Sequence, residues 1–134
     1  MIFDKSNCEL INTKDVYLHD DWFISLEFNR DEKILILHMI KYNNKQPYLM
    51  KFNDVAGFEM TSSDFWGASD TVLDYEYVTS EKAALISRLQ NTWLDTPYTD
   101  KNFCFEDHFF ETLFTFTSGD SLRVVAKTVE FTKQ

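Results

Sequence analysis

Every second residue from 22 to 28 is large and apolar, and this spacing constrains the fold more than any other feature. A period of two places alternate side chains on opposite faces of an extended strand, so that one face can lie on a core. After a polar turn at 29–33, residues 34–42 are apolar and β-branched enough to predict a central strand. These two strands are expected to form a hairpin.

Five further segments have the aromatic and β-branched composition of strands. They are residues 48–52, 55–61, 72–78, 103–116 and 122–131. The first continues the meander, and the last two, joined by Gly119-Asp120, predict a long C-terminal hairpin. In segment 72–78, alternation places Leu73 with the two tyrosines on one face and Asp74 and Glu76 on the other.

Residues 79–94 have the spacing of a helix. Their large apolar side chains recur three or four positions apart at Leu85, Ile86, Leu89 and Trp93. Thr79-Ser80 predicts the N-cap, and Pro97 lies just beyond the predicted end. The expected fold is therefore α+β: a mostly antiparallel sheet, built from a meander and a C-terminal hairpin, with one main helix packed on it. Residues 1–134 are expected to form a single domain.

The charge of the chain argues against binding to nucleic acid or to a membrane surface. Asp and Glu number 22 against 13 Lys and Arg, which gives a net charge of −9 and no basic patch. The first residues lack the apolar run of a signal peptide, so a soluble, cytoplasmic protein is expected. Cys8 and Cys104 are isolated thiols with no metal or redox spacing, and the oligomeric state is left open.

Few residues in the chain point to catalysis. With only three glycines, no phosphate-binding loop or nucleophile elbow can be written. Two clusters join a histidine to carboxylates, His19-Asp20-Asp21 and Glu106-Asp107-His108. They would support a metal-dependent or acid-base hydrolase only if the fold brought them together, and solvated charges at turns explain them more simply. We expect no catalytic residues, no metal and no cofactor.

Residues 58–77 are the best candidate for a recognition surface, because they set bulky aromatics among hydroxyls and carboxylates. Phe65 and Trp66 either fold back onto the core or anchor a protein partner. The predicted partner-binding residues are Asp64, Phe65, Trp66, Asp70, Asp74 and Glu76.

In size, acidity and strand-rich pattern, with Phe65-Trp66-Gly67 and Ser118-Gly119-Asp120 as local features, the chain resembles small bacterial α+β proteins of the immunity-protein type. The resemblance implies inhibition of a basic partner such as a toxin, which the carboxylates and Trp66 would occlude. The alternative is a small-ligand-binding domain with a pocket lined by some of the many Phe and Tyr side chains.

Overall fold

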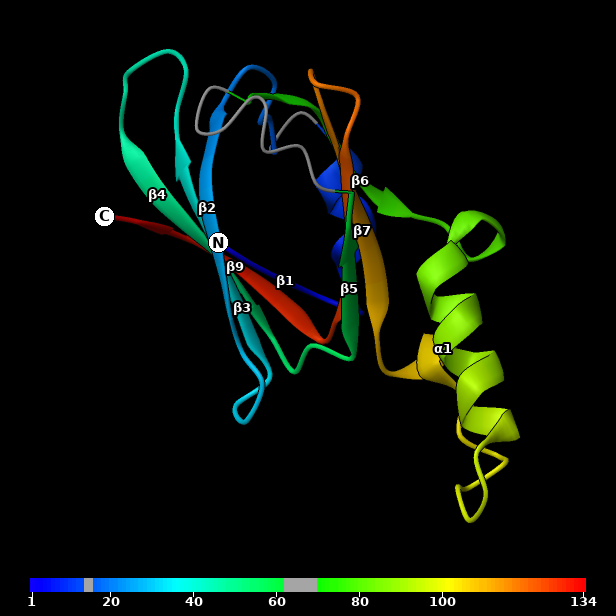
Figure 1. Cartoon of the computed structure of the whole chain (residues 1–134). Coiled ribbons are helices and arrows are strands. Elements are labelled where there is room, and N and C mark those ends of the chain that lie inside the picture. The colour runs from blue at the N-terminus through cyan, green and yellow to red at the C-terminus, as the bar shows by residue number, and fades with distance from the viewer. Residues whose placement is uncertain (14–15, 62–69) are drawn as a thin grey trace.

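Two antiparallel sheets and one main helix make up the fold in the computed structural model, which describes residues 1–13, 16–61 and 70–134 (Figure 1). The strands are β1 (Ile2–Asp4), β2 (Trp22–Asn29), β3 (Ile34–Ile40), β4 (Pro47–Asn53), β5 (Gly57–Met60), β6 (Val72–Val78), β7 (Phe110–Phe116), β8 (Ser121–Ala126) and β9 (Thr128–Lys133). The helices are α1 (Ala84–Asp95) and the short 3-10 turns η1 (Cys8–Asn12), η3 (Ser80–Lys82) and η4 (Phe105–Asp107). The predicted class, α+β with dominant antiparallel pairing, is confirmed.

The first sheet has the strand order β1-β9-β4-β3-β2 and contains the predicted meander. In the β2–β3 hairpin Phe28 pairs with Leu35, and Lys33 adopts a left-handed conformation, φ 58°, in the turn. Along β3 the odd-numbered residues from Leu35 to Met39 are buried and the even-numbered ones are half-buried.

The period of two predicted for residues 22–28 is only partly correct. A β-bulge between Phe23 and Ser25 interrupts it, so that Ile24 is 39% exposed while Phe23 packs against the core.

The second sheet has the order β5-β8-β7-β6. Its β7–β8 hairpin turns at Gly119, whose φ of 93° suits glycine, and Phe116 N–H donates to the Asp120 carbonyl across the turn. The prediction of a strand across 122–131 was wrong in one respect. The chain changes sheet at Lys127, whose N–H donates to the Asn53 carbonyl, so that β8 and β9 lie in different sheets.

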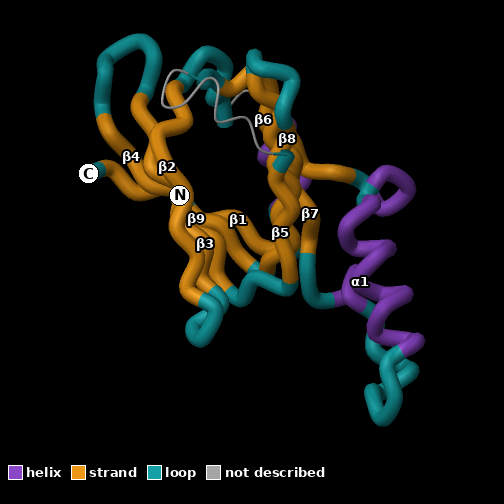
Figure 2. The backbone as a smooth tube through the Cα atoms, in the orientation of Figure 1, coloured by secondary structure: helices purple, strands orange, loops and turns teal. Residues whose placement is uncertain are grey.

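The main core lies between the two sheets, and Figure 2 shows the strands curving around it. The rings of Tyr75 and Phe114 are tilted by 34° with centroids 4.2 Å apart, and those of Phe114 and Phe116 lie parallel at 5.9 Å. The largest fully buried side chains come from both sheets and include Leu35, Leu37, Met39, Met50, Phe52, Phe110, Phe114, Phe116 and Leu122. Burial of this shared apolar surface holds the sheets together.

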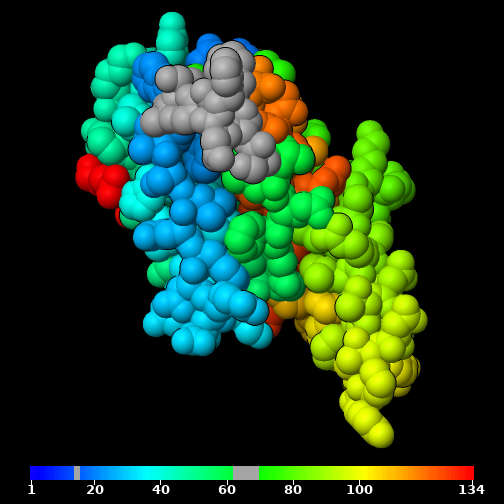
Figure 3. Space-filling view, in the orientation of Figure 1, coloured from blue at the N-terminus to red at the C-terminus, as the bar shows by residue number. Residues whose placement is uncertain are grey.

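Helix α1 packs on the outer face of the second sheet, and its C-terminal end extends past the strands (Figures 1 and 3). Leu85 and Ile86 are buried against the sheet, as the helical spacing predicted. The predicted start was wrong. Thr79 precedes the separate turn η3, and α1 begins at Ala84 without a side-chain cap from its own N-cap residue.

Residues 103–109 were predicted as the start of a strand, and this prediction was wrong because they pack on α1 instead. The Gln90 side chain donates to the Phe103 carbonyl at 2.9 Å and accepts from the Phe105 N–H at 2.8 Å. The Trp93 ring lies 5.2 Å from that of Phe103 and 5.8 Å from that of Phe105. These contacts belong to a second apolar cluster, which lies between α1 and the outer face of the second sheet.

Candidate binding surface

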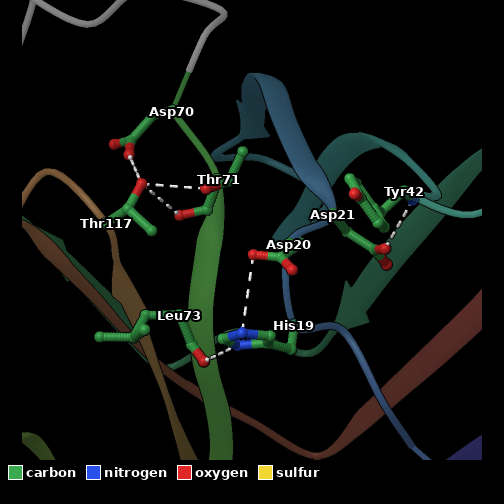
Figure 4. A network of polar contacts seen from close by, with 8 residues as sticks. All are labelled: His19, Asp20, Asp21, Tyr42, Asp70, Thr71, Leu73 and Thr117. Carbon is green, nitrogen blue, oxygen red and sulfur yellow. Dashed lines mark hydrogen bonds and ion pairs between the residues drawn. The ribbon is translucent and has the colours of Figure 1, made fainter.

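The edges of the two sheets meet where the segment before β2 runs beside the start of β6 (Figure 4). Trp22 and Thr71 form an antiparallel bridge. Next to it, Asp20 N–H donates to the Val72 carbonyl at 2.8 Å, and Val72 N–H donates to the Asp21 carbonyl at 2.9 Å. This junction fixes the N-terminal end of β6, the strand that carries two of the predicted partner-binding residues.

Asp70, predicted to contact a partner, lies in this junction with only 6% of its surface exposed. Its carboxylate accepts hydrogen bonds from the Ser118 hydroxyl at 2.8 Å and from the Thr117 hydroxyl at 3.4 Å. The Ser118 N–H donates to the same group at 3.3 Å. These bonds tie Asp70 to the β7–β8 turn, so the carboxylate that the sequence offered to a partner is engaged within the protein.

His19 is fixed to the edge of β6. Its Nδ1 lies 2.8 Å from the Leu73 carbonyl oxygen, and its Nε2 lies 3.6 Å from Asp20 Oδ1. Asp20 adopts a left-handed conformation, φ 71°, which is uncommon outside glycine. Both side chains are nearly half exposed, which leaves them at the surface beside the strand.

Asp21, the third member of that cluster, is not a solvated charge, because only 1% of it is exposed. Its carboxylate accepts from the Tyr48 hydroxyl at 2.7 Å, from Lys41 Nζ at 3.0 Å and from the Tyr42 N–H at 2.9 Å. Burial, and after it the Asp21 carboxylate, raises the pKa of Tyr48. The three donors compensate the buried charge and make Asp21 a structural residue.

The second histidine cluster lies at the opposite end of the β6–β7 pair. Val72 pairs with Phe116 near His19, whereas Val78 pairs with Glu111, three residues after His108. The His108 ring stacks on Phe103, with centroids 5.1 Å apart. Within residues 1–13, 16–61 and 70–134, no group of three His, Cys, Asp or Glu side chains is arranged to hold a metal ion.

Asp74 and Glu76 are exposed on the outer face of β6, as the alternation predicted. Leu73 was predicted on the opposite face with Tyr75, and that prediction was wrong. A β-bulge between Val72 and Asp74 shifts the register, so that Leu73 is 48% exposed while Tyr75 is buried. The bulge therefore adds an apolar side chain to the surface that carries the two acids.

A hollow of about 350 Å³ lies beside this strand. Tyr17, which is 66% exposed, lines it together with His19, Leu73 and Asp74. Apolar surface, hydrogen-bonding groups and a carboxylate thus meet along one edge.

Further along the same edge, one side chain makes the hydrogen bonds that a neighbouring strand would otherwise make. Asn12 of η1 accepts from the Tyr77 N–H at 2.7 Å and donates to the Tyr77 carbonyl at 3.1 Å. Burial, and after it Cys8, Glu9 and Glu106, raises the pKa of Tyr77. Two glutamates thus lie near enough to this end of β6 to act on Tyr77, and Lys5 is a nearby base.

Three of the predicted site residues, Asp64, Phe65 and Trp66, lie outside the described residues. The residues that the sequence did not single out are Tyr17 and Glu9, and Glu106 was considered only as part of a histidine cluster; all three come to β6 from other parts of the chain. The only sequence signal for them is that they are aromatic or acidic residues in segments predicted as turns or loops, where side chains are usually exposed.

Comparison with known proteins bears on the fold alone. No protein-family model matches the sequence, and a search of curated proteins gives no match. Among solved structures, the chain is similar to the crystal structure of an uncharacterized protein from Neisseria gonorrhoeae, with a TM-score of 0.51 and 11% sequence identity. The alignment covers 86% of this chain and 92% of that one. No helix in the described part of the chain is long and apolar enough to cross a membrane.

Proposed function

We propose that this protein binds a basic protein partner on the outer face of β6 and the hollow beside it. One observation carries the proposal: Asp74 and Glu76 stand exposed on an edge strand beside a hollow that also exposes Tyr17 and Leu73. Interfaces combine an apolar centre with a polar rim, and aromatic side chains are enriched in the centre. Here Tyr17 and Leu73 would form the apolar centre, and Asp74 and Glu76 would form the polar rim.

The negative charge of this surface favours a partner with a basic binding face. Asp20 lies at one end of the strand, Glu9 and Glu106 act on Tyr77 at the other, and Lys5 is a nearby base. A negative strip on a chain of net charge −9 attracts Lys and Arg side chains, speeds encounter and disfavours acidic partners. The resemblance to immunity-type proteins implies a toxin as such a partner and occlusion as the mode of action. Trp66 is proposed as a further anchor.

Charge reversal on β6 tests the proposal against a matched control. The double variant D74K/E76K changes the net charge by +4, and so does D31K/E32K in the exposed β2–β3 turn. Affinity capture from the native host would identify a partner, and calorimetry with that purified partner would measure each affinity. We expect D74K/E76K to weaken binding by about 100-fold and D31K/E32K to leave it within about threefold, because close charge pairs couple by a few kcal/mol.

The variant W66A measures the aromatic contribution apart from the contribution of charge, since it leaves the net charge unchanged. It is expected to weaken binding of the same partner. Equal affinities for D74K/E76K and D31K/E32K would exclude β6 as the binding surface. Capture of only acidic proteins would exclude the proposed partner class.

A further inference from the structure

A second hollow, of about 530 Å³, lies on the other side of the segment that carries Tyr17. This volume is within the range of sites for small organic ligands. Its apolar wall comes from distant parts of the chain and includes Val16, Leu18, Tyr48 and Phe131. Leu18 and Tyr48 are buried in the core, and Phe131 packs against it, so this wall is held by the sheets. An apolar ligand would therefore meet a preformed surface.

The charged side chains of this hollow are basic, and its other polar side chains are neutral. Lys41 and Lys133 line it, and none of its described lining residues carries a carboxylate, although the chain as a whole has a net charge of −9. Such a concentration of positive charge on an apolar wall favours a ligand that is itself apolar and anionic.

Lys41 is held in a fixed position with hydrogen-bonding capacity to spare. Its ammonium donates to the Tyr17 carbonyl at 2.8 Å and to the Asp21 carboxylate at 3.0 Å. An ammonium has three N–H donors, so a third remains on a side chain that is 31% exposed. The Asp21 carboxylate does not line the hollow, and it bonds to two side chains that do, Lys41 and Tyr48, so an anion in the hollow meets the lysine before the buried carboxylate.

We propose that this hollow binds a small amphipathic carboxylate, with its apolar body against Val16, Leu18 and Phe131 and its carboxylate on Lys41. Lys133 adds a second positive charge at the surface. The carboxylate accepts the remaining N–H of Lys41 as a charge-assisted hydrogen bond, which is stronger than a bond to a neutral group. This hollow shares the segment that carries Tyr17 with the hollow beside β6, but the proposal does not depend on the partner proposed for that surface.

Three probes with the same tail test the chemistry: decanoate, 1-decanol and decyltrimethylammonium, each below its micelle concentration. Binding is followed by changes in the amide NMR signals of the folded protein. Decanoate is expected to bind about tenfold more tightly than decanol, since a charge-assisted bond is roughly twice as strong as a neutral one. The cation is expected not to bind, and the shifted signals are expected at Val16, Leu18 and Phe131.

Variants identify the residue responsible. Lys41→Met alone leaves the buried Asp21 without its cation and endangers folding, so the double variant D21N/K41M removes both charges together. In this variant decanoate is expected to bind no more tightly than decanol. Lys133→Met is expected to weaken decanoate binding, whereas Lys51→Met, on β4 and outside this hollow, changes the charge equally and is expected to have no effect.

Three outcomes would overturn the inference. They are failure of all three probes to bind, equal affinity of wild-type protein for decanoate and decanol, and signal changes confined to residues away from the hollow. Retention of the preference for decanoate by D21N/K41M would exclude Lys41 as the anchor.

Discussion

Glu111 Oε1 accepts a hydrogen bond of 2.8 Å from the backbone N–H of Ile86, in the first turn of α1. Glu111 comes from β7 and is fully buried, and its other carboxylate oxygen lies 2.6 Å from Arg123 Nη1 on β8. The first amides of a helix have no partner within the helix, and negative charge near them is stabilising. A side chain of the sheet thus serves as the missing cap and joins the helix to both strands.

Substitution of Glu111 is expected to be strongly destabilising. Glu111→Ala leaves the Ile86 N–H without its acceptor and Arg123 without its ion pair, which predicts a loss of about 3–5 kcal/mol in the free energy of unfolding. Glu111→Gln keeps an acceptor for Ile86 and is expected to lose less, about 1.5–3 kcal/mol. Urea denaturation, with midpoint and slope both fitted, measures these differences.

Glu59 provides the control, because it also links the sheet to α1, through an exposed ion pair with Arg88. Glu59→Gln is expected to cost less than about 1 kcal/mol, as exposed ion pairs contribute little. Equal losses for Glu59→Gln and Glu111→Ala would show that burial of Glu111 does not decide its contribution.

The same contact explains why the start of the helix could not be read from the sequence. Thr79-Ser80 has the composition of a cap, but the group that satisfies the Ile86 N–H lies 25 positions later in the chain. By contrast, β3 as a strand and the buried side of α1 were predictable from composition and helical spacing. The alternation predicted for 22–28 failed in part, because the bulge in β2 leaves Ile24 exposed. Strand β1 is only three residues long, too short to show a period.

In the candidate site, too, some features follow from the local sequence and others depend on distant contacts. The outward direction of Asp74 and Glu76 followed from alternation, whereas the exposure of Leu73 depends on a bulge that no local pattern marks. The burial of Asp70 and Asp21 depends on donors from distant segments, namely Ser118 and Tyr48. Contacts of that kind are set by the folded chain and leave no local signal.

Two buried tyrosines are expected to respond oppositely to loss of the hydroxyl. Tyr48 donates to the buried Asp21 carboxylate at 2.7 Å, so Tyr48→Phe is expected to lower the free energy of unfolding by about 1.5–3 kcal/mol. The buried Tyr75 and Thr112 hydroxyls are close enough to interact, but neither makes a hydrogen bond of good geometry to the other or to any further described residue. Tyr75→Phe is therefore expected to be neutral or slightly stabilising.

Thermal and urea unfolding of the two variants beside wild-type protein check this contrast. A substantial loss of stability in Tyr75→Phe would mean that its hydroxyl is satisfied in solution, for example by a buried water.

The raised pKa values of the same two tyrosines predict that the protein loses stability at alkaline pH. Burial is the main cause that raises the pKa of both Tyr48 and Tyr75 above the ordinary value of about 10. The folded protein therefore holds these protons more tightly than the unfolded chain does. Their contribution to stability is complete below pH 10 and is lost as the pH rises above it, by up to about 1.4 kcal/mol per pH unit for each group.

Urea midpoints between pH 8 and pH 11 measure this dependence. The double variant Y48F/Y75F is expected to flatten the decline, and Tyr98→Phe, at a fully exposed position, is expected to leave it as in wild-type protein. A decline of equal steepness in Y48F/Y75F would assign the alkaline instability to other groups.

The last prediction concerns Gln90, whose side chain holds residues 103–105 against α1 through one donated and one accepted hydrogen bond. Gln90→Ala removes both bonds at a part-buried position, and each contributes about 1 kcal/mol. The aromatic cluster is separate from the core between the two sheets, so its release is expected to be local. Amide hydrogen exchange is expected to accelerate at Phe105 and to remain unchanged in β3 and β4.

Asn91, at the next, exposed position of α1, supplies the control, since Asn91→Ala should leave Phe105 protected. Unchanged protection of Phe105 in Gln90→Ala would show that ring packing with Trp93 alone holds the segment in place.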